Sequence, residues 1–134
     1  MEYLTVAHAL LWHLYGPQRL GEEARQAFAD ADAGQACIHV PAVVLAEALM
    51  VVQKGRLRGV TLAHLLPYLD VMATSDNCPL CPLRPHTVIA SHHYTIIPDI
   101  FDRLIVTEAI SHGLPLLTRD TMIRASGLVA VIWD

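Results

Sequence analysis

Asp99-Ile-Phe-Asp102-Arg103-Leu-Ile-Val-Thr-Glu-Ala-Ile110, followed by Gly113-Leu-Pro-Leu-Leu-Thr118-Arg119-Asp120, is the stretch that decides the fold of this chain. It predicts an amphipathic helix that opens with carboxylates, then a turn, a short apolar strand and one further acid. Asp99 and Asp102 share one face of that helix. Asp120 follows the apolar run 114–117, which is typical of a buried parallel strand, and ligands of open α/β sheets gather at the carboxyl ends of such strands. Carboxylates gathered there repel one another, so either a divalent cation neutralises them or they are not close.

The rest of the chain alternates apolar runs with helical segments. The expected strands are 3–7, 36–40, 77–83, 114–117 and 128–133, and the expected helices are 9–15, 21–33, 42–53, 62–73, 85–93, 99–110 and 120–125. Two prolines interrupt the run 77–83, which we therefore place at the edge of the sheet. This alternation predicts a single three-layer α/β domain over residues 1–134, with a central parallel sheet of four to five strands and helices on both faces.

Composition limits the classes of protein to consider. Of 134 residues, 54% are hydrophobic and 16% are charged, which excludes a disordered chain and favours one domain with a sizeable core. The apolar surplus indicates a surface that is buried by a partner or by a second copy. The net charge of −4 does not favour nucleic-acid binding through bulk attraction, so such binding would need a local basic patch. We interpret the tight basic cluster Lys54, Arg56 and Arg58 as a solvated helix end.

The sequence carries no apolar run of membrane-spanning length and no recognisable secretory signal, so we expect a cytoplasmic protein with no membrane partner. Its three cysteines, an odd number, argue against a disulfide framework. Cys78 and Cys81 form a Cys-x-x-Cys without a second ligand pair at finger spacing. We interpret them as unpaired thiols near the sheet edge rather than as a zinc pair.

Glu47 is the second informative acid. It lies in Ala42-Val-Val-Leu-Ala-Glu-Ala-Leu-Met-Val-Val52, the most apolar helical segment of the chain. Apolar neighbours on every helical side make a purely solvent-facing role difficult. A buried carboxylate without a partner is expensive, so we expect a partner or a metal ion beside it, ahead of the alternative of a structural salt bridge.

These residues resemble those of the PIN domain, especially the VapC-like ribonuclease toxins of bacterial and archaeal toxin–antitoxin pairs. Four pieces carry the resemblance over nearly the whole chain: Thr5-Val6-Ala7-His8-Ala9-Leu10-Leu11-Trp12, Glu47, Asp99-Ile100-Phe101-Asp102-Arg103-Leu104 and Thr118-Arg119-Asp120. Each piece alone is weak evidence for this family. All four pieces in this order and at these separations are specific to it.

The resemblance implies a metal-dependent phosphodiesterase with catalytic residues Glu47, Asp102, Asp120, Thr118 and Asp99. Glu47, Asp102 and Asp120 would hold Mg²⁺ or Mn²⁺, directly or through water, so that the ion activates water against a phosphodiester of RNA. Thr118 would orient a water or a ligand, and Asp99 would support the site from its rim.

The chain departs from the family pattern at its first motif. Val6 stands where the family has an aspartate that is a central metal ligand, and Ala7 stands where a small hydroxyl residue is usual. Valine cannot coordinate a hard cation, and strand alternation sends Thr5 to the opposite face. We therefore expect weak metal binding and impaired catalysis.

Three functions remain open from the sequence. The first is a Mg²⁺- or Mn²⁺-dependent endoribonuclease toxin, impaired by Val6, that acts on RNA and is inhibited by a cognate antitoxin. The second is a catalytically degenerate PIN-fold binding protein that retains its dimer and antitoxin surfaces. A small-molecule-binding domain of flavodoxin-like shape is the third, and the missing phosphate loop weighs against it. We expect the apolar surplus to be buried in a two-fold homodimer, with 9–15 and 62–73 as candidate surfaces.

Overall fold

The computed structural model describes residues 1–134 and contains one five-stranded sheet in which every pairing is parallel. The strands are β1 (Glu2–Thr5), β2 (Cys37–Pro41), β3 (Leu80–Cys81), β4 (Leu116–Leu117) and β5 (Val131–Ile132). Their order across the sheet is β3-β2-β1-β4-β5, which places β1 at the centre. The predicted parallel sheet is confirmed, and β3, the strand flanked by prolines, is at its edge as expected.

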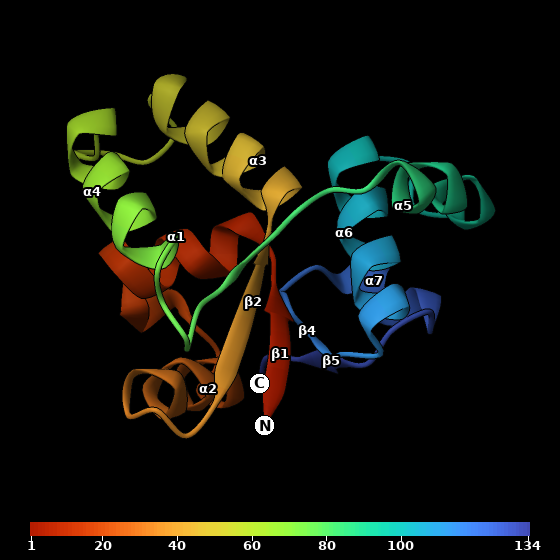
Figure 1. Ribbon diagram of the computed structural model, residues 1–134, viewed down its shortest axis with the longest axis horizontal. Helices are drawn as coiled ribbons and strands as arrows, with labels where there is room; N and C mark the ends of the chain where they lie inside the picture. Colours follow the sequence, from red (N-terminus) through yellow and green to blue (C-terminus); the bar gives the residue numbers. More distant parts are fainter.

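Helices cover both faces of this sheet (Figure 1). The α-helices are α1 (Ala7–Tyr15), α2 (Glu22–Asp32), α3 (Ala42–Gln53), α4 (Leu62–Met72), α5 (Pro85–Ala90), α6 (Ile100–His112) and α7 (Thr121–Ser126), with short 3-10 turns η1 (Pro17–Arg19) and η2 (Ser91–Tyr94). In Figure 1 helices α1 to α4 lie on one side of the strands and α5 to α7 on the other. The three-layer α/β architecture is therefore confirmed.

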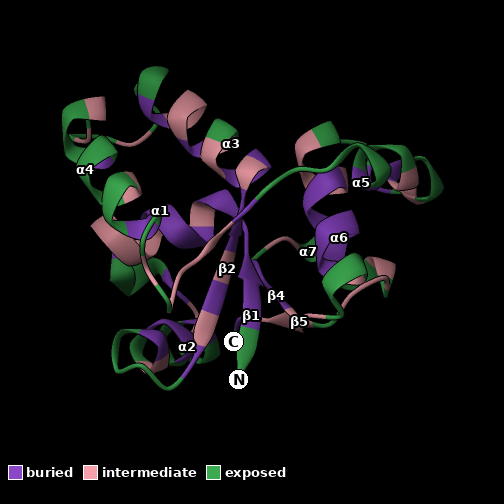
Figure 2. Cartoon of the chain, in the orientation of Figure 1, coloured by how far each residue is buried: buried purple, intermediate pink, exposed green.

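The core is built from the apolar runs that predicted the strands. Leu4, Ile38, Val40, Leu116 and Leu117 have no exposed surface. Figure 2 shows the buried colour continuing from the strands into α6, whose residues 104–109 are all buried. A parallel sheet packed on both faces needs such near-continuous apolar strands, which is why the pattern was readable from the sequence.

Helices α6 and α7 begin one residue later than the sequence predicts, because Asp99 and Asp120 are their N-caps. Helix α3 spans residues 42–53 as predicted. Asp99 precedes α6 as its N-cap and accepts a hydrogen bond from the Asp102 N–H at 3.0 Å, so it is not on the helix face that we expected. Strand β1 ends at Thr5, and Val6 is the N-cap residue of α1 instead of part of the strand.

No helix of this structure is both long enough and apolar enough to cross a membrane.

Gly21 fixes where the C-terminal end of the chain packs against α2. Its φ of −63° is accessible to any residue, but a Cβ there would overlap the backbone carbonyl of Trp133. That carbonyl accepts a hydrogen bond from the Ala24 N–H at 3.3 Å.

We predict that Gly21→Ala lowers the free energy of unfolding by about 2 kcal/mol, because backbone atoms must move apart. Gly16→Ala, whose Cβ would meet only side-chain atoms at 3.7 Å or more, is the matched control. Urea unfolding measures both, and equal midpoints for the two variants would contradict this packing.

Candidate functional site

Two neighbouring hollows lie beyond the carboxyl ends of β1 and β4. The first is lined by Val6, Ala7, His8, Leu11, Trp12, Arg19, Glu47, Val51, Arg56, Leu57 and Asp102. The second is lined by His8, Trp12, Arg119, Asp120, Thr121 and Met122. They share His8 and Trp12, which stand between them on α1. The carboxyl ends of β1 and β4, which pair side by side, thus bring α1, α3, α6 and the start of α7 to one edge of the sheet.

Glu47 and Asp102 line the same hollow although they come from different helices. Glu47 is half-buried on α3, and Asp102 is half-buried in the first turn of α6. Helices α3 and α6 pack against each other, which brings the two carboxylates together. The apolar surroundings expected for Glu47 are therefore present, and a second carboxylate stands beside it.

Both carboxyl groups hold their protons more tightly than usual. Burial, together with the smaller contributions of the Asp102 and Asp99 charges, raises the pKa of Glu47 to about 7. Burial likewise raises the pKa of Asp102 to about 6, with contributions from Asp99 and Asp120. Desolvation and like charge both disfavour ionisation, and a cation placed between these groups would relieve both penalties.

Asp120 faces the second hollow and also caps a helix. Its Oδ1 accepts a hydrogen bond from the Ile123 N–H at 2.9 Å, which makes it the N-cap of α7. The fully buried Thr118 accepts a hydrogen bond from the Asp120 N–H at 3.0 Å through its Oγ1. Asp99 and Asp120 therefore each use one carboxylate oxygen to cap a helix, which leaves the other oxygen for a ligand.

The predicted ligands are thus near one another, without forming a compact cluster. Glu47 and Asp102 share a hollow, while Asp120 lines the adjacent one and acts on Asp102 through its charge. Their oxygens are not grouped within 4.8 Å of one another; the group of side chains that meets this distance is Glu2, Cys37 and His39, elsewhere in the molecule. Val6 lines the first hollow with only 3% of its surface exposed, and it offers no side-chain oxygen there.

Sequence reasoning missed the aromatic and basic residues around these acids. His8 accepts a hydrogen bond from the Arg119 N–H at 3.1 Å, and burial lowers its pKa to about 4, so it is a neutral acceptor that fixes the Arg119 loop. The guanidinium carbons of Arg19 and Arg119 lie 5.9 and 5.8 Å from the Trp12 ring centroid. Arg56, which we interpreted as part of a solvated helix end, lines the hollow that holds Glu47. The spacing of His8 and Trp12, one turn apart on α1, was the available signal.

Comparisons with known proteins agree with this architecture. The family model of the PIN domain matches residues 3–127. Among solved structures, the crystal structure of VapBC2 from Rickettsia felis, bound to a DNA fragment from their promoter, is 15% identical with a TM-score of 0.70 and coverage of 100% of both chains. FitAcB from Neisseria gonorrhoeae is 17% identical with a TM-score of 0.59, over 98% of this chain and 96% of that one. No curated protein sequence matches.

The raised pKa values predict how stability depends on pH. In the unfolded chain Asp102 titrates near 3.9 and in the folded protein at about 6, so the folded state binds the proton more tightly between these values. Its ionisation therefore costs stability as pH rises through this window, and the full cost is present above about pH 7. We predict that Asp102→Asn raises the free energy of unfolding by roughly 1 kcal/mol at pH 8 and changes it little at pH 4.

Denaturant unfolding of metal-free protein at both pH values measures this difference. Asp70→Asn, at an exposed position on α4, is the control and should leave the free energy of unfolding unchanged at both pH values. A loss of stability at pH 8 in Asp102→Asn would show that the Asp102 carboxylate is stabilised in the folded protein instead of repelled.

Proposed function

Because the chain belongs to the PIN domain family, we propose that it is the VapC-type subunit of a toxin–antitoxin pair, a metal-dependent endoribonuclease whose catalysis is impaired by Val6. One observation carries the proposal. The half-buried acids Glu47 and Asp102 line the same hollow as Arg19 and Arg56, so groups that hold a cation stand beside groups that bind phosphate.

The donor set suits a hard divalent cation such as Mg²⁺ or Mn²⁺. Glu47, Asp102 and Asp120 offer carboxylate oxygens only, the ligand type that these ions prefer. The raised pKa values of Glu47 and Asp102 support the assignment, because they reflect a repulsion that a cation would remove. The set is one carboxylate short, since Val6 occupies the expected place of the fourth. We therefore assign Glu47, Asp102 and Asp120 as metal ligands with weak binding.

When bound, the ion would lower the pKa of a coordinated water and stabilise charge on the phosphate. Glu47 and Asp102 would hold the ion in their ionised forms, so their protons would have to leave first and affinity would rise with pH up to about 7. Thr118 holds the backbone at Asp120 and so orients that carboxylate. Asp99 adds negative charge from the rim while it caps α6.

Arginine and tryptophan side chains supply the proposed contacts to RNA. A net charge of −4 gives no long-range attraction, so binding must come from local contacts. Arg19, Arg56 and Arg119 border the two hollows and match phosphate geometry. Trp12 stands between the hollows and offers a ring on which an unpaired base can stack. This arrangement favours single-stranded RNA, and an RNA substrate accords with the cytoplasmic location that the sequence predicts.

A second candidate function is a PIN-fold binding protein that no longer cuts RNA. The burial of Val6 in the wall of the hollow favours it, because no polar side chain stands in for the missing acid at that position. In this case the RNA, dimer and antitoxin surfaces remain while hydrolysis is lost. Cleavage by the unmodified chain distinguishes the two functions.

Replacing Val6 tests the metal site directly. We predict that Val6→Asp tightens Mn²⁺ binding by at least about tenfold and raises metal-dependent cleavage of a mixed-sequence single-stranded RNA, because it restores a carboxylate to the hollow. Val6 is also the N-cap residue of α1, so an aspartate there stabilises the helix as well. Val6→Asn caps equally without a charge and should leave Mn²⁺ affinity unchanged.

Isothermal titration with Mn²⁺ and a gel-based cleavage assay give the two readouts. Asp102→Asn in the Val6→Asp background should abolish both binding and cleavage. Strong metal-dependent cleavage by the unmodified chain that survives Asp102→Asn would mean that another site is the catalyst.

We also propose that the chain forms a homodimer that binds a cognate antitoxin. Leu66, Tyr68 and Val71 on α4 are 47%, 47% and 67% exposed, and Tyr68 packs against Tyr15 of α1 with ring centroids 6.0 Å apart. These exposed apolar side chains lie in the regions that the sequence singled out for dimerisation. A contact that covers them would remove apolar surface from water.

Sedimentation at tens of micromolar, above the dissociation constants of ordinary homodimers, tests the dimer. We predict a dimer for the unmodified chain and a monomer for Leu66→Glu combined with Val71→Glu. Ile89→Glu, an exposed change on α5, should remain dimeric. A monomeric unmodified chain would refute the proposed dimer.

A further inference from the structure

Three ligand-type side chains meet at the amino end of the sheet, away from the acidic hollows. In the parallel pairing of β1 with β2, Glu2 is opposite Cys37, and Leu4 is opposite His39. Side chains alternate along a strand, so Cys37 and His39 lie on one face, and Glu2 joins them on that face from the neighbouring strand. About 13 Å of strand separates Glu2 from Val6, which places this group at the other end of β1.

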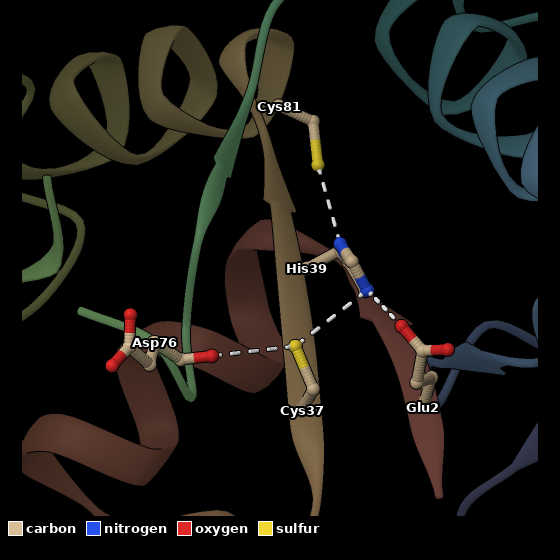
Figure 3. Close-up of polar contacts among 5 residues, drawn as sticks. All are labelled: Glu2, Cys37, His39, Asp76 and Cys81. Atoms are coloured by element: carbon tan, nitrogen blue, oxygen red, sulfur yellow. Dashed lines mark hydrogen bonds and ion pairs between the residues drawn. The ribbon is translucent and has the colours of Figure 1, made fainter. Parts of the chain in front are cut away.

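The geometry brings one atom of each side chain toward a common point (Figure 3). The His39 Nε2 lies 2.7 Å from the Glu2 Oε1 and 3.6 Å from the Cys37 Sγ. All three ligand atoms lie within 4.8 Å of one another. A four-coordinate ion with ligands at about 2.0 to 2.3 Å needs donor atoms at this spacing, after small rotations of the side chains.

Outer contacts hold these ligands in place. The His39 Nδ1 lies 3.7 Å from the Sγ of Cys81, a residue of β3 (Figure 3). In the metal-free protein the Cys37 thiol donates a hydrogen bond to the backbone carbonyl of Asp76 at 3.7 Å, which positions the sulfur and is given up when the thiol loses its proton. A partner on the second ring nitrogen fixes the orientation of a metal-binding histidine, and such partners are usual around protein metal centres.

Solvent reaches the group from two sides. One open hollow is lined in part by Met1, Glu2, Cys37 and Asp76. A second hollow, lined in part by His39 and Cys81, lies toward α6. A cation therefore has a path to the three side chains without unfolding of the sheet.

We propose that Glu2, Cys37 and His39 form a site for a borderline-soft divalent cation of the Zn²⁺ class, independent of the acidic hollows and of the proposed nuclease function. Thiolate and imidazole ligands select Zn²⁺ over Mg²⁺ and Mn²⁺, which prefer oxygen alone. A carboxylate, a thiolate and a neutral imidazole sum to a charge of −2, which balances the cation. A water molecule completes four-coordination.

Binding moves protons in a defined way. The Cys37 thiol becomes a thiolate and its proton goes to solvent. In the metal-free protein the neutral His39 ring carries its proton on Nε2 and donates it to Glu2. To free Nε2 for the cation, the ring must change to the tautomer with the proton on Nδ1, which faces the Cys81 sulfur. From the form in which His39 is neutral, one proton is released for each cation bound, and no electron is transferred.

Co²⁺ titration of the full chain without a histidine tag, under a phosphine reductant, tests the site. We expect a thiolate-to-cobalt charge-transfer band that saturates at one equivalent, disappears on addition of Zn²⁺ and persists in excess Mg²⁺. Cys37→Ser and His39→Ala should lose the band. Cys78→Ser, a matched change outside the group, and Asp102→Asn, in the acidic hollow, should keep it. Cys81→Ala should weaken affinity by about 10- to 100-fold.

Thermal unfolding separates loss of the site from loss of the fold. Zn²⁺ should raise the melting temperature of the unmodified chain and leave that of Cys37→Ser unchanged, while the two proteins show the same far-ultraviolet spectrum without metal. The proposal is overturned if the band is absent in the unmodified chain, if it survives Cys37→Ser, or if Cys78→Ser removes it.

Discussion

The half-burial of two carboxyl groups, Glu47 and Asp102, in one hollow formed by the packing of α3 against α6 is the constraint on which the proposed function depends. Burial and like charge raise both pKa values, to about 7 and about 6. Near neutral pH the pair must take up a proton or a cation, or lose stability. An apolar α3 and a buried α6 are needed to hold the acids against this repulsion, and Arg19 and Arg56 border the same hollow.

Structural features that depend on residues close together in the sequence were predicted correctly. Apolar runs predicted the parallel sheet, the prolines beside β3 placed it at the edge, and the residues of α3 were predicted to its ends. Polar side chains at helix ends were harder to interpret, because a carboxylate before a helix is equally suited to capping the helix and to binding a metal ion. Asp99 and Asp120 are N-caps as well as candidate site residues. Contacts that depend on strand register, such as Glu2 opposite Cys37, have no signal in a single sequence.

The two candidate cation sites differ in chemistry and lie at opposite ends of β1. The carboxyl end gathers carboxylates from α3 and α6 beside the apolar Val6, while the amino end gathers oxygen, sulfur and nitrogen atoms from β1 and β2. The acidic site should therefore prefer hard ions such as Mg²⁺, and the site at the amino end should prefer borderline-soft ions such as Zn²⁺. The parallel sheet explains the arrangement, because it brings the start of each strand to one edge and the end of each strand to the other.

Carboxyl-carbon NMR titration of the metal-free protein is the most direct measurement of the central claim, that Glu47 and Asp102 repel each other in one hollow. We expect a pKa of about 7 for Glu47 and of about 6 for Asp102. In Asp102→Asn the pKa of Glu47 should fall toward its ordinary value. Titration of both carboxyl groups near their ordinary values of about 4, with Glu47 unaffected by Asp102→Asn, would contradict this claim.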